Sequence, residues 1–163
     1  MKRVLAIVLV TILIGAALLV TAAPAVARTS QDVMTGSGII GTSRNPSVVV
    51  GFVLRGNIDQ LPNMLTVIWG GNYFRMDTLT AVEFSDDPTI DPRPPLARFD
   101  TMHGFGVGKY NRVGGYQGEF IFTDAGEPGR NDWAWIKITA SNGDTILEVS
   151  GFLRCGNQQA LSI

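Results

Sequence analysis

Strand-like alternation of side chains runs through most of this sequence and restricts the fold more than any other feature. In residues 116–123 the side chains of Tyr116, Phe120 and Phe122 fall on one face of an extended chain. None of the β-branched and aromatic stretches keeps the i, i+3, i+4 apolar spacing of a helix. We therefore expect an all-β domain, an antiparallel sandwich or a small barrel of about eight strands, near residues 33–40, 47–55, 64–70, 72–84, 97–108, 115–123, 132–140 and 145–154.

Glycine is the second structural signal, with 19 residues in the chain. Asn142-Gly143, between two predicted strands, favours a hairpin whose two central residues both take positive φ. Gly104, Gly106 and Gly108 alternate along one face of a strand, which is typical of a bend, a bulge or the close approach of a neighbouring aromatic ring. A phosphate-binding loop is the alternative, but the sequence after these glycines does not predict the helix that such a loop needs.

Residues 1–27 have the features of a signal peptide. Lys2 and Arg3 precede an apolar run, and Ala25-Val26-Ala27 supplies the small-x-small pattern of a cleavage site. We expect a signal-peptide helix over residues 1–27 and a single secreted domain over residues 28–163, located outside the cell or in the cell envelope. An uncleaved anchor is the alternative, because the apolar run is almost long enough to span a membrane; after cleavage we expect no stable membrane insertion.

Charge, histidine and cysteine content exclude several functions. Without Lys2 and Arg3 the net charge changes from -1 to -3, with 11 cations against 14 carboxylates, and the cations form no stripe. Nucleic acid is therefore not an expected partner. His103 and Cys155 are the single histidine and cysteine, too few for an intrachain disulfide or a zinc site. A serine hydrolase would have to use His103, and no G-x-S-x-G motif is present. We expect no catalytic residue.

The segment 124–132 is the first candidate site. It combines three carboxylates with a proline and two glycines. Glu127-Pro128-Gly129-Arg130 predicts a type II turn, in which proline occupies the second position and glycine takes positive φ at the third. Such a turn would bring Asp124 and Asp132 close together at the ends of two strands.

Three interpretations of these carboxylates stay open. Asp124 and Asp132, joined by Glu127 and Asn131, form a candidate Ca²⁺ site, since Ca²⁺ takes six or more oxygen ligands. Alternatively, the Asp side chains accept hydrogen bonds from backbone N–H groups and build a structural turn. The third interpretation is a carboxylate pair for glycoside hydrolysis, drawn from Asp124, Glu127 and Asp132.

A pair of tryptophans gives a candidate binding surface. Trp133 and Trp135 are predicted to share one face of their strand, and Trp69, Tyr73 and Tyr110 would extend it into a platform for a sugar or a partner protein. In the alternative, both indoles cover one side of the core. Burial separates the two hypotheses, because fully buried indoles exclude a platform.

The carboxylate loop also carries a family resemblance. It resembles the C-terminal signature of the bacterial secreted post-COAP domains, which occur beside choice-of-anchor surface modules; the residues are Asp124-x-Gly126-Glu127-Pro128-Gly129-x-x-Asp132 and Ser150-Gly151-x-Leu153-x-x-Gly156-Asn157. Similar earlier landmarks extend the resemblance over about residues 35–159: Gly36-Ser37-Gly38-Ile39, Gly51-Phe52 and Gly114-Gly115-Tyr116. Arg154 and Cys155 depart from the pattern, since such domains tend to have glycine there.

The resemblance implies an exported all-β module with no established enzymatic activity. We therefore expect a non-catalytic structural or interaction module of the bacterial cell surface or extracellular space, whose partner is an extracellular protein or glycan. A calcium-dependent carbohydrate-binding or adhesion module is the second hypothesis, and a carboxylate-based hydrolase is the third.

Overall fold

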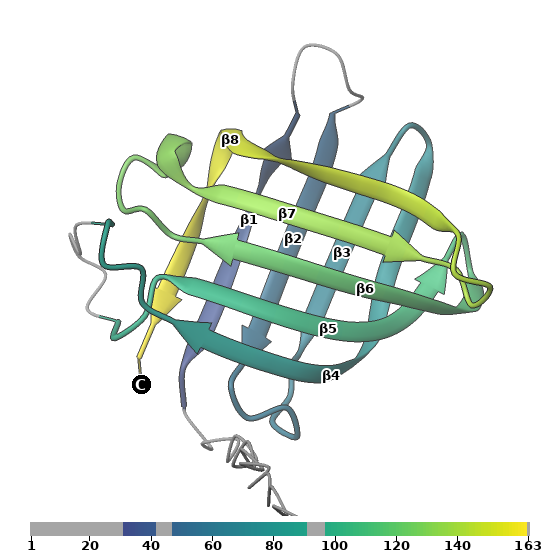
Figure 1. Ribbon diagram of the computed structural model, residues 1–163, viewed down its shortest axis with the longest axis horizontal. Coiled ribbons are helices and arrows are strands. Elements are labelled where there is room, and N and C mark those ends of the chain that lie inside the picture. Colours follow the sequence, from purple (N-terminus) through teal and green to yellow (C-terminus); the bar gives the residue numbers. More distant parts are fainter. Residues whose placement is uncertain (1–30, 42–46, 91–96, 163) are drawn as a thin grey trace, which may run out of the picture.

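The chain forms a closed barrel of eight antiparallel strands (Figure 1). The computed structural model describes residues 31–41, 47–90 and 97–162. Each strand pairs with its neighbours in the chain, and the first pairs with the last. The strands are β1 (Val33–Ile40), β2 (Val48–Arg55), β3 (Met64–Trp69), β4 (Asn72–Ser85), β5 (Thr101–Tyr110), β6 (Val113–Thr123), β7 (Trp133–Thr139) and β8 (Thr145–Leu161).

The all-β prediction is confirmed. Of the two predicted architectures, a sandwich and a small barrel, the barrel is correct. The sandwich is wrong because β1 pairs with β8 along its whole length, from Val33 opposite Leu161 to Ile40 opposite Leu153, and so closes the sheet on itself. The signal-peptide helix predicted over residues 1–27 lies outside the described residues.

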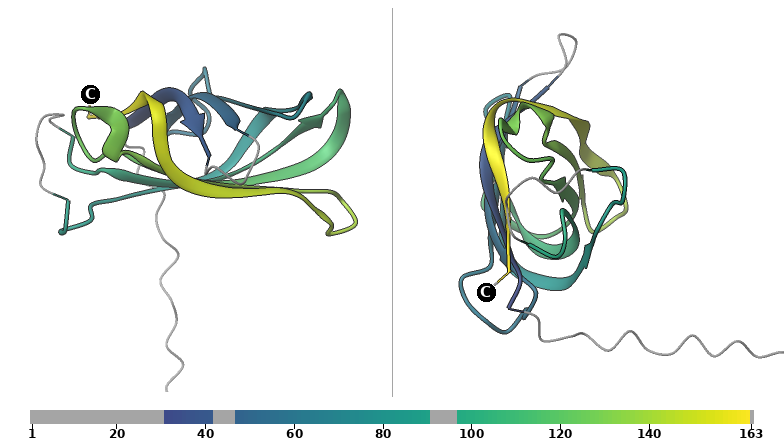
Figure 2. Two further views of the ribbon diagram at one scale, coloured as in Figure 1. Left: turned by 90° about the horizontal axis from the view of Figure 1, so that it is seen from above. Right: turned by 90° about the vertical axis from the view of Figure 1, so that its left-hand side faces the viewer.

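The barrel is flattened into two layers whose strands cross. β5, β6 and β7 form one layer, β1, β2 and β3 form the other, and the long strands β4 and β8 bend from one layer into the other (Figure 1, Figure 2). The register of β4 against β5 shifts between Met76 and Thr78 and again between Leu79 and Ala81. Bulges of this kind sharpen the bend of a strand, so they allow β4 to turn the corner.

Side chains fill the centre of the barrel. Alternate residues of β6 and β7 are buried, and this confirms the predicted aromatic face of residues 116–123. The ring of Phe52 in β2 stacks on that of Phe122 in β6, with centroids 3.9 Å apart and planes inclined by 5°. This contact joins the two layers within a cluster of buried hydrophobic side chains that forms a packed core.

The glycine stripe of β5 faces this core. A Cβ atom at Gly104 would overlap the ring of Phe120, and one at Gly108 would overlap the backbone carbonyl of Arg75. A Cβ atom at Gly106 would likewise overlap the side chain of Met76. The predicted close approach of an aromatic ring and the predicted bulges are therefore both present.

The predicted hairpin at Asn142-Gly143 joins β7 to β8, but its backbone differs from the prediction. Of the two central residues only Gly143 has positive φ, 91°, and its N–H donates to the carbonyl of Ala140 at 2.9 Å. This is a type I turn followed by a glycine bulge. Positive φ at both central residues occurs instead in the β5–β6 turn, at Asn111 (47°) and Arg112 (74°).

Gln158 of β8 is a buried amide that weakens the core. The residue is 1% exposed, and among the described residues neither its amide nitrogen nor its oxygen has a hydrogen-bond partner. Leaving such a group unsatisfied costs about 1–3 kcal/mol. We expect Gln158→Leu to raise the midpoint of thermal unfolding by roughly 4 °C or more, measured by circular dichroism. Gln159→Leu, on the exposed side of the same strand, is the control; an equal effect of the two substitutions would contradict the explanation.

Candidate functional site

The loop between β6 and β7 contains a short 3-10 helix, η1 (Gly129–Asn131). The predicted type II turn over residues 127–130 is wrong, because Gly129 belongs to η1 and positive φ occurs earlier, at Gly126 (82°). A side chain at position 129 would overlap Asn157 of β8. Glycine is required here because the loop packs directly against that strand.

Asp124 ties the start of this loop to β8. The residue is 4% exposed. Its Oδ1 accepts the N–H of Gly126 at 2.9 Å, and its Oδ2 accepts the N–H of Ala160 at 2.8 Å. One carboxylate therefore shapes the loop and also satisfies a backbone donor of a distant strand.

Asp132 ties the other end of the loop to β8. It is fully buried, its Oδ1 accepts the N–H of Ala125 at 3.0 Å, and its Oδ2 accepts the N–H of Gln158 at 2.6 Å. Burial raises the pKa of Asp132 to about 6, although both backbone hydrogen bonds act in the opposite direction. The geometry thus matches the structural turn, in which Asp side chains accept backbone N–H bonds.

The other two predicted calcium ligands are exposed. Glu127 Oε1 accepts a hydrogen bond from Asn157 Nδ2 at 2.7 Å, whereas Asn131 ends η1 without a side-chain hydrogen bond to a described residue. In residues 31–41, 47–90 and 97–162, no cluster of three or more His, Cys, Asp or Glu side chains has the arrangement of a metal site. The calcium site stays a prediction, which a thermal melt with and without EDTA tests.

The carboxylates of this loop do not form an open pair. Asp124 and Asp132 are buried, and all four of their oxygens accept backbone N–H groups. Neither these residues nor Glu127 line the two cavities that the structure describes. A glycosidase needs both carboxyl groups in contact with the substrate, so this geometry gives the hydrolase hypothesis no support.

The two tryptophans lie on the outside of the barrel. Trp133 and Trp135 alternate with buried residues of β7 and are themselves partly exposed, so the alternative that both cover the core is wrong. Trp133 lies opposite Phe152 of β8, which is 64% exposed, and Trp135 lies opposite Ile121 of β6. We call these four residues, together with Phe105 of β5, which is 39% exposed, the outer aromatic face.

Polar groups border the outer aromatic face. The indole Nε1 of Trp135 donates to Glu148 Oε1 at 3.4 Å. His103 Nε2 lies 3.0 Å from Glu119 Oε1, and the His103 ring contacts that of Phe105, with centroids 4.6 Å apart. Flat aromatic rings are therefore accompanied by hydrogen-bonding side chains on the same wall.

The predicted extension of this platform is wrong for all three of its residues, because Trp69 and Tyr110 pack in or against the core and Tyr73 lies elsewhere on the wall. Trp69 is 8% exposed and stacks on Tyr110 with ring centroids 5.6 Å apart. Trp69 faces inward because it shares the buried face of β3 with Leu65 and Val67. Tyr73 lies on β4 and lines a different feature, a groove that the sequence did not reveal.

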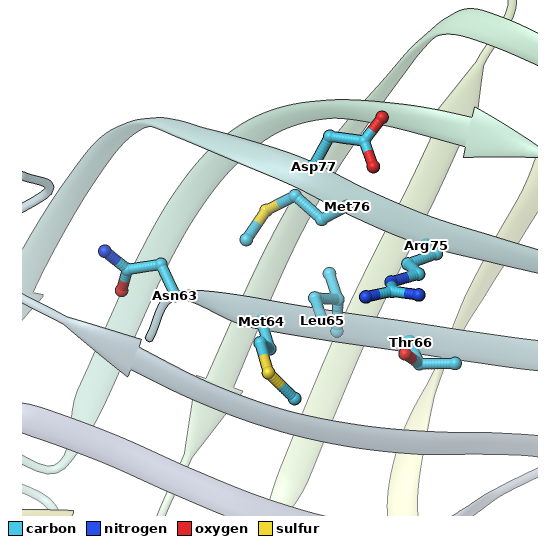
Figure 3. A pocket seen from close by; sticks show the side chains of 7 residues that line it. All are labelled: Asn63, Met64, Leu65, Thr66, Arg75, Met76 and Asp77. Carbon is cyan, nitrogen blue, oxygen red and sulfur yellow. The ribbon is translucent and has the colours of Figure 1, made fainter. Parts of the chain in front are cut away.

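That groove lies over β3, β4 and β5. One cavity of about 400 Å³ opens between β3 and β4 (Figure 3), where their pairing stops at Thr66 opposite Arg75. A second cavity, of about 370 Å³, lies over β4 and β5. Both are lined by Arg75 and Asp77. No motif marks these residues, because they come from separate strands and resemble ordinary exposed charges.

Comparison of the chain with family models, curated proteins and solved structures gave no match. The fold and the sites define a filled antiparallel barrel with two surfaces on its outer wall. In the part of the chain that the structure describes, no helix has the length and apolarity needed to cross a membrane. The resemblance to post-COAP domains stays a prediction.

Proposed function

We propose that the protein is a non-catalytic, exported interaction module of the bacterial cell envelope or extracellular space, and that its outer aromatic face binds a polysaccharide. The observation that carries the proposal is that the partly exposed Trp133 and Trp135 lie beside the exposed Phe152 on the barrel wall. Exposing large apolar side chains to water is unfavourable, and contiguous exposed patches commonly mark binding surfaces.

Two features favour a sugar chain as the ligand. Aromatic rings present flat apolar surfaces, and they carry a polar edge in the case of tryptophan. Glu119, Glu148 and His103 border these rings and offer acceptors and donors to sugar hydroxyl groups. A protein partner could use the same apolar centre and polar border, so self-association is tested alongside sugar binding.

The signal-peptide pattern of residues 1–27 and the resemblance to post-COAP domains support the compartment. Both point to export from a bacterial cell. The buried hydrogen bonds of Asp124 and Asp132 support a structural role for the loop that carries the family signature. The barrel then acts as a rigid scaffold that presents the outer aromatic face.

The test is binding to neutral polysaccharides. The purified domain is sedimented with insoluble cellulose and chitin and titrated with soluble β-glucan while tryptophan fluorescence is followed. We expect retention on at least one of these polymers, and the double variant Trp133→Ala/Trp135→Ala to bind about tenfold more weakly or worse, since each lost ring contact is worth about 1 kcal/mol.

Val113→Ala is the matched control, because Val113 is 61% exposed but lies at the start of β6, next to the β5–β6 turn and outside the outer aromatic face. Equal binding of the double variant and the wild type would refute the proposal. So would failure of every polymer, or self-association that disappears in the double variant, which would identify the face as a protein interface.

A further inference from the structure

The two cavities described above share a wall, and we treat them together as one groove. Arg75 and Asp77 line both. From them the groove extends to Asn63 and Met64 at the start of β3 and, in the other direction, to the β5–β6 turn. In Figure 3 the guanidinium group of Arg75 lies over the gap between β3 and β4. A ligand in this groove would therefore cross three strands.

Positive charge is concentrated in this groove. Its charged lining residues are Arg75, Lys109, Arg112 and Asp77, which gives three cations against one carboxylate, a net charge of +2. The whole chain has a net charge of -1. The groove thus has the opposite sign to the protein as a whole and attracts anions.

The strand register places two like charges next to each other in the groove. Arg75 of β4 lies directly opposite Lys109 of β5, and like charges in facing positions destabilise a sheet. Lys109 pairs with Asp77 at 3.3 Å. Within the described residues no carboxylate pairs with the guanidinium groups of Arg75 and Arg112. A bound anion would remove this repulsion.

The other lining residues indicate what kind of anion fits. The arginine fork matches the geometry of carboxylate and phosphate groups. Tyr73 adds a half-exposed aromatic ring, and Asn63 and Thr66 add hydrogen-bonding groups. A groove with cations at intervals, a ring and neutral polar groups suits a sugar chain that carries carboxylates.

An acidic peptide is the competing ligand, since it could pair with the edge of β4 below Arg75. In this stretch β4 is bulged against β5, with register shifts at Met76/Thr78 and Leu79/Ala81, and such bulges bend the strand. Bulges and charged side chains are the devices by which proteins block strand addition. We propose that the groove binds a linear, carboxylate-bearing polysaccharide, with its carboxylates on Arg75 and Arg112 and a sugar ring on Tyr73.

The test uses polygalacturonate as the probe, with dextran as the neutral polymer and poly-glutamate as the acidic peptide. Binding is measured by affinity electrophoresis and calorimetry at low and high salt. We expect polygalacturonate to bind and salt to weaken the binding. Arg75→Gln and Arg112→Gln should each weaken it about tenfold or more, since each removes a charge-assisted contact.

Arg154→Gln is the matched control, because Arg154 is exposed on β8 outside the groove. Arg75→Gln should leave the thermal midpoint unchanged or higher, since it removes a like-charge pair, so lost binding will not reflect lost folding. The Trp133→Ala/Trp135→Ala variant should bind polygalacturonate normally, which separates this site from the outer aromatic face.

Three results would overturn the inference. One is the absence of polygalacturonate binding at low salt, and a second is unchanged binding in the Arg75→Gln and Arg112→Gln variants. The third is equal binding of poly-glutamate, which would show that any polyanion occupies the groove and would remove the assignment to a polysaccharide.

Discussion

Gly156→Ala is expected to prevent stable closure of the barrel. Gly156 of β8 faces Gly38 of β1 at the seam between the first and last strands. Its φ is 110°, a conformation that favours glycine. An added Cβ atom would overlap the carbonyl oxygen of Ser37 and the Cα atom of Gly38. Backbone strain and overlap together cost roughly 3–5 kcal/mol, a large part of the stability of a typical domain, about 5–15 kcal/mol.

Chemical denaturation followed by circular dichroism measures this loss. Gly51→Ala is the matched control, because Gly51 lies in β2 without positive φ and a Cβ atom there would meet nothing within 4 Å. That control should be neutral or slightly stabilising, since alanine reduces the entropy of the unfolded chain. If Gly156→Ala unfolds at the same denaturant concentration as Gly51→Ala, the seam does not depend on this glycine.

The alternation of side chains along the sequence predicted the strands. Closure of the barrel depends on contacts between distant residues, which this alternation does not contain. The predicted and observed starts of β1 and β8 agree, at residues 33 and 145, but β8 runs to Leu161 and not to residue 154. The predicted strand ended before Gly156 and the polar residues that follow it. In the barrel that glycine instead permits the close approach to Gly38, a partner more than a hundred residues away.

The candidate sites, like the fold, could be predicted from the sequence only in part. The spacing of Trp133 and Trp135 was enough to place both indoles on one face, but it could not show which face of the sheet points outward. The composition of residues 124–132 predicted a turn, yet two of the four backbone donors that hold its carboxylates belong to β8. Arg75 and Lys109 become neighbours only because the β4–β5 register places them opposite each other.

Asp132→Ala is expected to destabilise the protein strongly. The substitution leaves the backbone N–H groups of Ala125 and Gln158 without their acceptor, in a place where the carboxylate is fully buried. Hydrogen bonds to a charged group are worth about 1.5–3 kcal/mol each. After allowance for the cost of burying the carboxylate, we expect a loss of roughly 3 kcal/mol, or on the order of 10 °C in the midpoint of thermal unfolding. The exposed Asp144, which accepts a bond from Asn142 Nδ2, provides the control; Asp144→Ala should change the midpoint little.

The pH dependence separates Asp132 from an ordinary turn residue. Its pKa in the folded protein is about 6, above the usual 3.8, so between about pH 4 and pH 6 the folded chain holds a proton that the unfolded chain has lost. Stability contributed by this group therefore falls as the pH rises through that window. The advantage of the wild type over Asp132→Asn, which cannot titrate, should widen as the pH is lowered from about 7 to about 5. Parallel unfolding free energies of the two proteins across this range would show that burial does not raise the pKa of Asp132.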